Sequence, residues 1–208
     1  MTIECEAKFA LENCLDLERL LRPRAMLETP WHLESNTLYD REGELVATDR
    51  LLRLRRADGA TLTYKAPAPD PSEPGVKRRL EIECPLSRPG DMDLILRGLG
   101  YLPRLCYEKF RSVWTLTQAR VFLDILPFGH FLEIEASPAR IRGLALELGL
   151  DPRAALSQSY HDLHLVWLQV RHLEPCADFV FTPTEKERLQ LMLNCPPCGD
   201  ANAHRHSA

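Results

Sequence analysis

The sequence lacks three features that would place it in other classes of protein. It has no basic excess, since 26 lysines and arginines face 30 acidic residues at a formal net charge of -4, so we expect no stable nucleic-acid partner. It has no signal-peptide pattern and no apolar stretch long enough to span a bilayer, so we expect a cytoplasmic location without a membrane partner. Its seven cysteines form an odd, scattered set, which predicts reduced thiols rather than a disulfide framework.

The C-terminal tail contains residue types that bind zinc. They are Cys195, Cys198, His204 and His206. A single C-x-x-C pair without a second one has two interpretations, a structural zinc clip or a disordered terminus with incidental thiols.

The composition is that of one globular domain with a short appendage. Of the 208 residues, 45% are hydrophobic and 27% are charged, which excludes a disordered chain. We predict a domain over residues 1–172 and a C-terminal extension over 173–208, where prolines recur. A short helix within 184–193 is expected to pack back onto the domain.

Charged and apolar residues alternate with the period of a β-strand in several parts of the chain. The pair Asp58-Gly59 between two such runs predicts a hairpin. Strands are predicted over residues 3–9, 29–39, 51–56, 60–65, 77–84, 106–116, 120–126 and 131–136. Helices are predicted over 11–21, 91–99 and 139–148, with a further short helix opening at Pro152, and 159–173 is either a helix or an extended segment.

The charged positions of these strands carry both signs. They are Glu4, Glu6, Lys8, Arg53, Arg55, Lys65, Arg79, Glu81, Glu83, Lys109, Arg111, Asp124, Glu133 and Glu135. Any one row is compatible with the solvated face of an open sheet. Because many strands share the pattern, the set favours a closed barrel whose lumen is polar.

Converged carboxylates repel one another unless cations or a metal ion neutralise them. Paired Glu residues at two-residue spacing offer hard oxygen ligands, which suit Mg²⁺ or Mn²⁺. Arginine and lysine side chains neutralise and position phosphate oxygens. A metal beside a cationic lining therefore indicates phosphate chemistry.

The opening Glu4-x-Glu6-x-Lys8 resembles the signature of the CYTH family, also called the triphosphate tunnel metalloenzymes. One such match is weak, but the later charged blocks follow in the family's order and the resemblance covers roughly residues 1 to 165. These blocks are Leu51-Leu52-Arg53-Leu54-Arg55, Thr61-Leu62-Thr63-Tyr64-Lys65, Arg79-Leu80-Glu81-Ile82-Glu83, Glu108-Lys109-Phe110-Arg111, Leu123-Asp124 and Phe131-Leu132-Glu133-Ile134-Glu135.

The resemblance implies an α+β fold in which an eight-stranded antiparallel β-barrel forms a triphosphate tunnel, with helices packed outside. It implies catalytic roles for Glu4, Glu6, Lys8 and Glu133. The triphosphate-binding residues would be Lys8, Arg53, Arg55, Lys65, Arg79, Lys109 and Arg111. The ligands of Mg²⁺ or Mn²⁺ would come from Glu4, Glu6, Glu81, Glu83, Asp124, Glu133 and Glu135.

Members of the family hydrolyse inorganic triphosphate, thiamine triphosphate or RNA 5′-triphosphate ends, or convert ATP to cyclic AMP and pyrophosphate. We interpret this chain as a triphosphatase. The alternatives are a class IV adenylyl cyclase and a catalytically weak triphosphate-binding module. The expected partner is a small molecule, namely inorganic triphosphate, thiamine triphosphate or ATP, and the resemblance also leaves room for a homodimer.

Several residues near these blocks are given an ordinary structural interpretation. Lys77 and Arg78 are read as a solvated entry to a strand. Tyr160 is read as a packing residue, and His161 as a hydrogen-bonded helix or surface residue rather than a general base. The tryptophans are assigned to core or rim packing.

Overall fold

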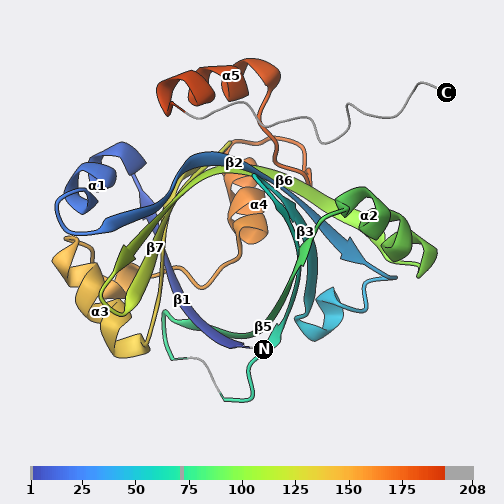
Figure 1. Ribbon diagram of the computed structural model, residues 1–208, viewed down its shortest axis with the longest axis horizontal. Coiled ribbons are helices and arrows are strands. Elements are labelled where there is room, and N and C mark those ends of the chain that lie inside the picture. The colour runs from blue at the N-terminus through green and yellow to red at the C-terminus, as the bar shows by residue number, and fades with distance from the viewer. Residues whose placement is uncertain (1, 71–72, 195–208) are drawn as a thin grey trace.

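The protein is described by a computed structural model that covers residues 2–70 and 73–194. Eight antiparallel strands close into a barrel in the order β1-β5-β4-β3-β2-β6-β7-β8 (Figure 1). The strands are β1 (Thr2–Leu11), β2 (Met26–Asp40), β3 (Leu51–Arg56), β4 (Ala60–Pro67), β5 (Lys77–Leu86), β6 (Leu102–Leu116), β7 (Ala119–Leu126) and β8 (Gly129–Ala136). The predicted eight-stranded α+β fold is confirmed.

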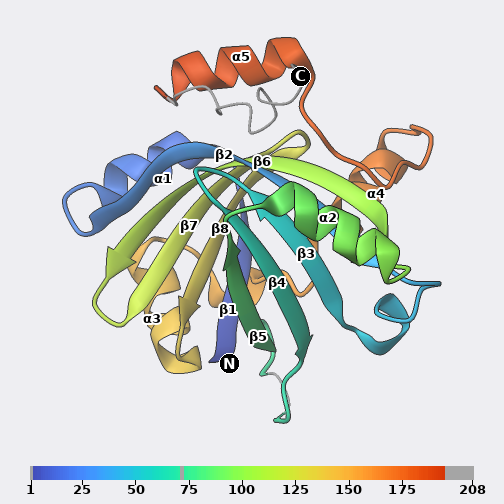
Figure 2. The ribbon, with the colours of Figure 1, turned by 45° about the vertical axis from the view of Figure 1, so that its right-hand side comes forward.

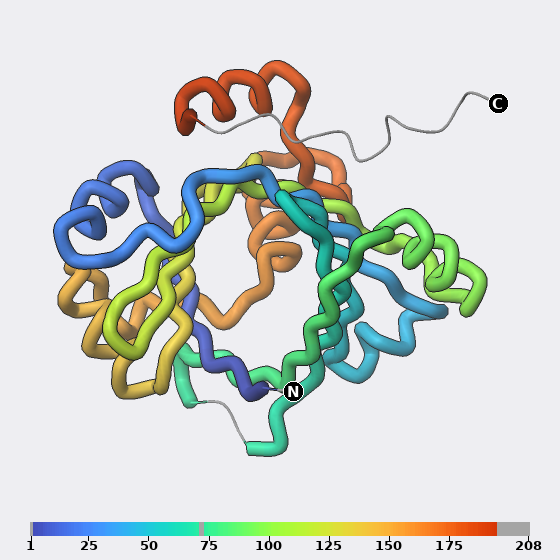
Figure 3. Tube along the Cα trace, in the orientation of Figure 1, coloured from blue at the N-terminus to red at the C-terminus, as the bar shows by residue number. Residues whose placement is uncertain are grey.

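Four of the helices lie on the outside of the ring, and α4 is seen through it at the far end (Figures 1 and 3). The helices are α1 (Cys14–Leu21), α2 (Pro89–Gly98), α3 (Pro138–Glu147), α4 (Tyr160–Val170) and α5 (Pro183–Met192), with 3₁₀ turns η1 (Val46–Thr48) and η2 (Pro152–Ala154). The helix predicted over 11–21 begins only at Cys14, because Leu11 still belongs to β1 and Asn13 caps the helix through its side chain.

Strand register places the charged rows inside the barrel and the apolar rows outside. Across β1 and β8, Glu6 pairs with Glu135 and Lys8 pairs with Glu133. Directly paired residues share one face of a sheet, so these side chains meet in the lumen. The residues between them face outward, where Ala7 joins the main hydrophobic core with apolar side chains of α1 and α3. Burying this outer face stabilises the barrel, while the lumen stays polar.

The segment that contains α4 crosses one end of the barrel (Figure 2). Leu156 bridges to Lys8 on β1 before the helix, and Phe179 bridges to Tyr107 on β6 after it. The helix starts at Ser159, whose side chain and that of Asp162 form a capping box. This cap settles the open interpretation of residues 159–173 in favour of a helix, and it brings the first turn of α4 to the end of the lumen.

The chain beyond residue 172 returns to the barrel. Phe181, Leu189 and Leu193 belong to the same hydrophobic core as the strands, and the helix expected within 184–193 is present as α5. Glu108 on β6 anchors this helix, because it accepts hydrogen bonds from the Phe181 backbone amide at 3.2 Å and from Lys186 Nζ at 2.7 Å. The division at residue 172 stays a prediction, and the candidate zinc ligands of the tail lie outside the described residues.

Within residues 2–70 and 73–194, no helix is long and apolar enough to cross a membrane. The cysteines of this part, Cys5, Cys14, Cys84, Cys106 and Cys176, carry free thiols.

The packing of α5 predicts different costs for two leucines on that helix. Leu189→Ala removes a side chain that is 8% exposed, whereas Leu191→Ala removes one that is 81% exposed. We expect the first change to lower the free energy of unfolding by about 2 kcal/mol or more and the second by less than ~0.5 kcal/mol. Urea denaturation of both variants measures this difference. Equal effects would mean that α5 does not pack on the barrel in solution.

Candidate active site

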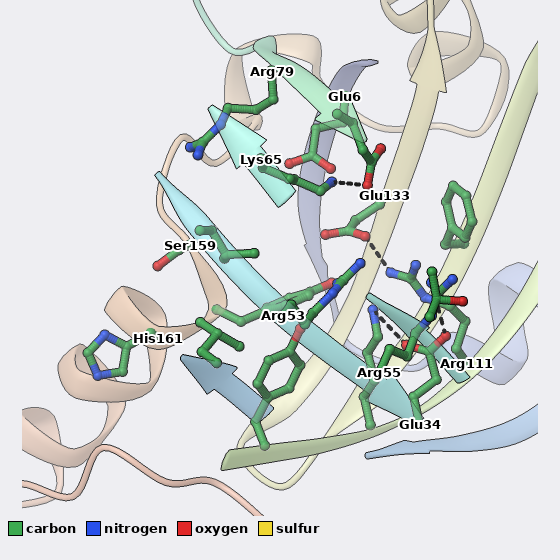
Figure 4. Close-up of a pocket in the computed structure, with 18 of the residues that line it drawn as sticks. Glu6, Glu34, Arg53, Arg55, Lys65, Arg79, Arg111, Glu133, Ser159 and His161 are labelled. Carbon is green, nitrogen blue, oxygen red and sulfur yellow. Dashed lines mark hydrogen bonds and ion pairs between the residues drawn. The ribbon is translucent and has the colours of Figure 1, made fainter. Parts of the chain in front are cut away.

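The lumen holds a cavity of about 910 Å³ that side chains from every strand of the barrel line. Figure 4 shows labelled charged residues of this cavity, with Ser159 and His161 at the side of α4. Twelve of the fourteen residues predicted for the site line the cavity; they are Glu4, Glu6, Arg53, Arg55, Lys65, Arg79, Glu81, Glu83, Lys109, Arg111, Glu133 and Glu135. The other two, Lys8 and Asp124, are 5% and 0% exposed and bond to residues of the lining.

Three carboxylates gather where β1 meets β8. Glu4, Glu6 and Glu135 each offer an oxygen, and these oxygens lie within 4.8 Å of one another. The remaining predicted metal ligands, Glu81, Glu83, Asp124 and Glu133, do not belong to this group. The strand register explains the set, because Glu6 pairs with Glu135 across the strands and Glu4 lies two residues before Glu6 on the same face of β1.

The electrostatics of the trio (Glu4, Glu6 and Glu135) indicate an excess of negative charge. Burial, and then the hydrogen bond and negative charge of Glu4, raise the pKa of Glu135 to about 8. Burial opposes ionisation of Glu4 as well, but Lys65 donates a hydrogen bond to it and its pKa is lowered. The pair therefore holds a proton at neutral pH in the absence of another cation. Oxygen ligands that need a positive partner fit a hard divalent ion.

The predicted ligands Glu133 and Asp124 bond to cationic side chains instead. Glu133 pairs with Lys8 at 3.0 Å and with Arg111. Asp124 accepts hydrogen bonds from Arg111 Nε at 2.6 Å and Lys109 Nζ at 3.2 Å. Burial disfavours ionisation of Glu133, yet Lys8 and Arg111 hold its pKa well below the usual range. The network keeps these carboxylates charged and fixes three cations in the wall of the cavity.

Arg53 and Arg55 form a second, more loosely held cationic region on β3. Arg55 lies 3.5 Å from Glu83 and 3.8 Å from Glu34. Arg53 donates hydrogen bonds to Thr63 at 3.3 Å and to the Tyr107 hydroxyl at 3.4 Å, and the Glu83 carboxylate is 3.9 Å away. Guanidinium groups with long, weak contacts are available to an anionic ligand.

The two other cations predicted to bind triphosphate have different surroundings. Lys65 contacts Glu4 and lies 3.3 Å from Glu81, so it faces the trio. Arg79 lines the cavity but is held near its edge by Asp49, through bonds of 2.9 Å to the side chain and 2.7 Å to the backbone oxygen. Figure 4 shows Arg79 at the margin of the group, apart from Arg53 and Arg55.

Sequence reasoning missed Glu34 and underrated Tyr160. Glu34 is 3% exposed and lies 3.6 Å from Lys109. The strand predicted over 29–39 has no aspartate, glutamate, lysine or arginine two positions away from Glu34, so it lacks the alternating charges that identified the other strands. The hydroxyl of Tyr160 donates to Asp124 at 2.7 Å, and Lys8 Nζ lies 4.3 Å from its ring centroid. Packing therefore describes only part of what Tyr160 does, because its hydroxyl and ring also contact the charged network of the lumen.

Lys77 was interpreted as a solvated entry to β5, but it lines the cavity. Burial and the nearby Lys8 lower its pKa. His161 also lines the cavity at the α4 end. The alternation did include Lys77, which occupies the same face as Arg79, Glu81 and Glu83, so this residue was predictable from the pattern.

Comparison with solved structures gives the same fold at low sequence identity. An adenylate cyclase candidate from Vibrio parahaemolyticus is 20% identical, with a TM-score of 0.69 over 78% of this chain and 98% of its own. The PH1819 protein of Pyrococcus horikoshii is 24% identical, with a TM-score of 0.63 over 78% and 98%. An adenylyl cyclase candidate from Hippeastrum, described as having a dominant triphosphatase activity, is 20% identical, with a TM-score of 0.56 over 85% and 99%.

Comparison with curated proteins finds no match to the chain. The family model of the CYTH domain matches residues 2–144, which include all eight strands and the carboxylate trio. The fold, the lumenal charges and this match lead to one assignment: the chain belongs to the CYTH domain family.

Proposed function

We propose that this protein is a divalent-metal-dependent triphosphatase that hydrolyses inorganic or organic triphosphate in the lumen of the barrel. One observation carries the proposal. A carboxylate trio with unbalanced negative charge and the loosely held guanidinium groups of Arg53 and Arg55 line the same cavity. A triphosphate chain needs a hard metal ion and a cationic lining at once, and this cavity supplies the residues for both.

The trio would hold Mg²⁺ or Mn²⁺. Its donor set consists of carboxylate oxygens, and the proton shared by Glu4 and Glu135 occupies the place of a cation. When bound, the ion would neutralise phosphate oxygens and favour ionisation of an attacking water.

The chain's own cations would bind the phosphates. Arg53, Arg55 and Lys65 would donate hydrogen bonds to phosphate oxygens, and Lys8 of β1 with Lys109 and Arg111 of β6 would supply fixed positive charge. Glu133, ionised and oriented by Lys8 and Arg111, would accept a hydrogen bond from the attacking water and orient it toward the phosphorus. Glu81 and Glu83 would orient Lys65 and the β3 arginines rather than bind the metal.

The second candidate function is that of an adenylyl cyclase, and the lining at the α4 end of the cavity supports it. Near α4 the lining becomes apolar and aromatic, with Leu38, Leu105, Tyr107 and Phe179. Such a wall could hold the base of ATP beside the charged region. Hydrolysis is preferred because it needs only a water beside the phosphate chain, and because the Hippeastrum structure, also named for cyclase activity, is described as having a dominant triphosphatase activity.

Product analysis separates the candidates. The protein with Mg²⁺ or Mn²⁺ would be incubated separately with inorganic triphosphate, thiamine triphosphate and ATP. We expect orthophosphate, released in a metal-dependent reaction. Cyclic AMP with pyrophosphate from ATP would instead identify a cyclase, and binding without any product would indicate a binding module.

The trio predicts a large loss of turnover from one isosteric change. Glu135→Gln keeps the side-chain shape but removes a negative ligand, so turnover should fall by at least ~100-fold while the fold is retained. Steady-state kinetics and circular dichroism measure the two effects. Glu187→Gln, an exposed change on α5, is the matched control and should leave turnover unchanged. Wild-type turnover in Glu135→Gln would overturn the metal assignment.

The raised pKa of Glu135 predicts how metal binding depends on pH. Below a pKa of about 8 this carboxyl is protonated, and it must lose its proton to bind a cation. The affinity for Mn²⁺ should therefore rise by up to about tenfold per pH unit between pH 6 and 7.5, then level off above pH 8. Calorimetry in two buffers of different ionisation enthalpy would count the released proton. No proton release at pH 6.5 would contradict the shared-proton description.

A further inference from the structure

Asn36 on β2 is a fully buried amide without a hydrogen-bond partner. Its exposed fraction is 0%, and neither Oδ1 nor Nδ2 is bonded. It pairs in register with Arg55 on β3 and with Tyr107 on β6, and both of these residues line the cavity. Since directly paired residues share a face, the amide of Asn36 is on the lumenal face of β2. A buried, unpaired amide destabilises a fold, so its presence calls for a function.

Arg53 and Tyr107, which line the cavity, bond to each other across the strand that carries Asn36. Strand β2 is flanked by β3 and β6, yet Arg53 of β3 donates a hydrogen bond to the Tyr107 hydroxyl of β6. This bond therefore passes over the lumenal face of β2, where Asn36 is adjacent to Leu38, the register partner of Arg53. A bridge at this position would cover the Asn36 amide, which agrees with its 0% exposure. At 3.4 Å the bond is long, so the cover is weakly held.

The contacts that hold Arg53 in this bridge are weak. Its Nε is buried and has no hydrogen-bond partner, and its contacts are two neutral hydroxyls and a carboxylate 3.9 Å away. Arg111 differs, because it bonds both Asp124 and Glu133. An anion that enters the lumen can bind Arg53 with the loss of only weak hydrogen bonds. Binding to Arg111 would instead compete with its bonds to Asp124 and Glu133.

We propose that Asn36 is a further triphosphate-binding residue, covered by Arg53 and Tyr107 until a phosphate chain draws the Arg53 guanidinium away. Nδ2 of Asn36 then donates to the phosphate oxygen that Arg53 binds. Oδ1 accepts the hydroxyl hydrogen of Tyr107, whose oxygen Arg53 has released. The inference rests on the proposed function, since it assumes that the cavity binds triphosphate, and it satisfies both amide atoms that are unpaired in the protein alone.

The substitution Asn36→Leu tests the inference because leucine has nearly the same size and no polar atoms. Replacing an unpaired buried amide should raise the midpoint of urea unfolding. The same change should weaken metal-free binding of inorganic triphosphate, measured by calorimetry, by about tenfold. A simple structural role would give the opposite stability effect and no change in affinity.

Ser112→Ala is the matched control. Ser112 is also 0% exposed, but its hydroxyl accepts a hydrogen bond from Trp114 Nε1 at 3.1 Å. This variant should lower the unfolding midpoint and leave triphosphate affinity unchanged. Unchanged affinity in Asn36→Leu, or a lowered midpoint, would overturn the role of Asn36 while wild-type binding upholds the proposed function. Failure of the wild-type protein to bind inorganic triphosphate, thiamine triphosphate and ATP, with Mn²⁺ present or absent, would overturn both.

Discussion

The structure depends on neutralising the charges that the closed barrel buries in its own lumen. Asp124 and Lys109 are 0% and 2% exposed, and an unpaired charge at such a position would cost several kcal/mol. Strand register provides the pairing, because Arg111 lies opposite Asp124 and Lys8 lies opposite Glu133. A slip of one residue between these strands would move the charges into the apolar outer core. Charge pairing and strand register are therefore a single constraint on this fold.

The candidate functional groups are those that this pairing leaves incomplete. The trio at β1 and β8 has more carboxylates than nearby cations, so Glu135 keeps a proton. On β3, Arg53 has only weak partners. These regions are separated by β5 and β4 on one side of the ring and by β2, β6 and β7 on the other. The proposed ligand, an anionic phosphate chain with a divalent cation, would complete both regions at once.

Period-two alternation was sufficient to predict the strands and the lumenal orientation of nearly all charged rows. It was insufficient to predict which charges meet, because β1 pairs with β8 from the far end of the barrel sequence, as Glu6 with Glu135. Asp124 and Glu133 were therefore assigned to the metal, although neighbouring strands present Lys8, Lys109 and Arg111 to them. Arg79 has the correct orientation, but Asp49, from a loop without alternation, binds it. Tyr160 reaches the charged network from helix α4, and alternation along strands cannot identify a residue on a helix.

In the proposed function the charged lining would contact only the phosphate chain, so it would not select among triphosphates. Selection needs groups at the end of the cavity, where Tyr107, Phe179 and His161 lie. Two of these three come from the segment around α4, which follows the last residue matched by the family model. Backbone bridges at Leu156 and Phe179 join this segment to the barrel. Apart from Tyr160, this segment can change without disturbing the buried charge pairs. Under the proposed function, substrate preference would therefore diverge in this segment while the charged lumen stays the same.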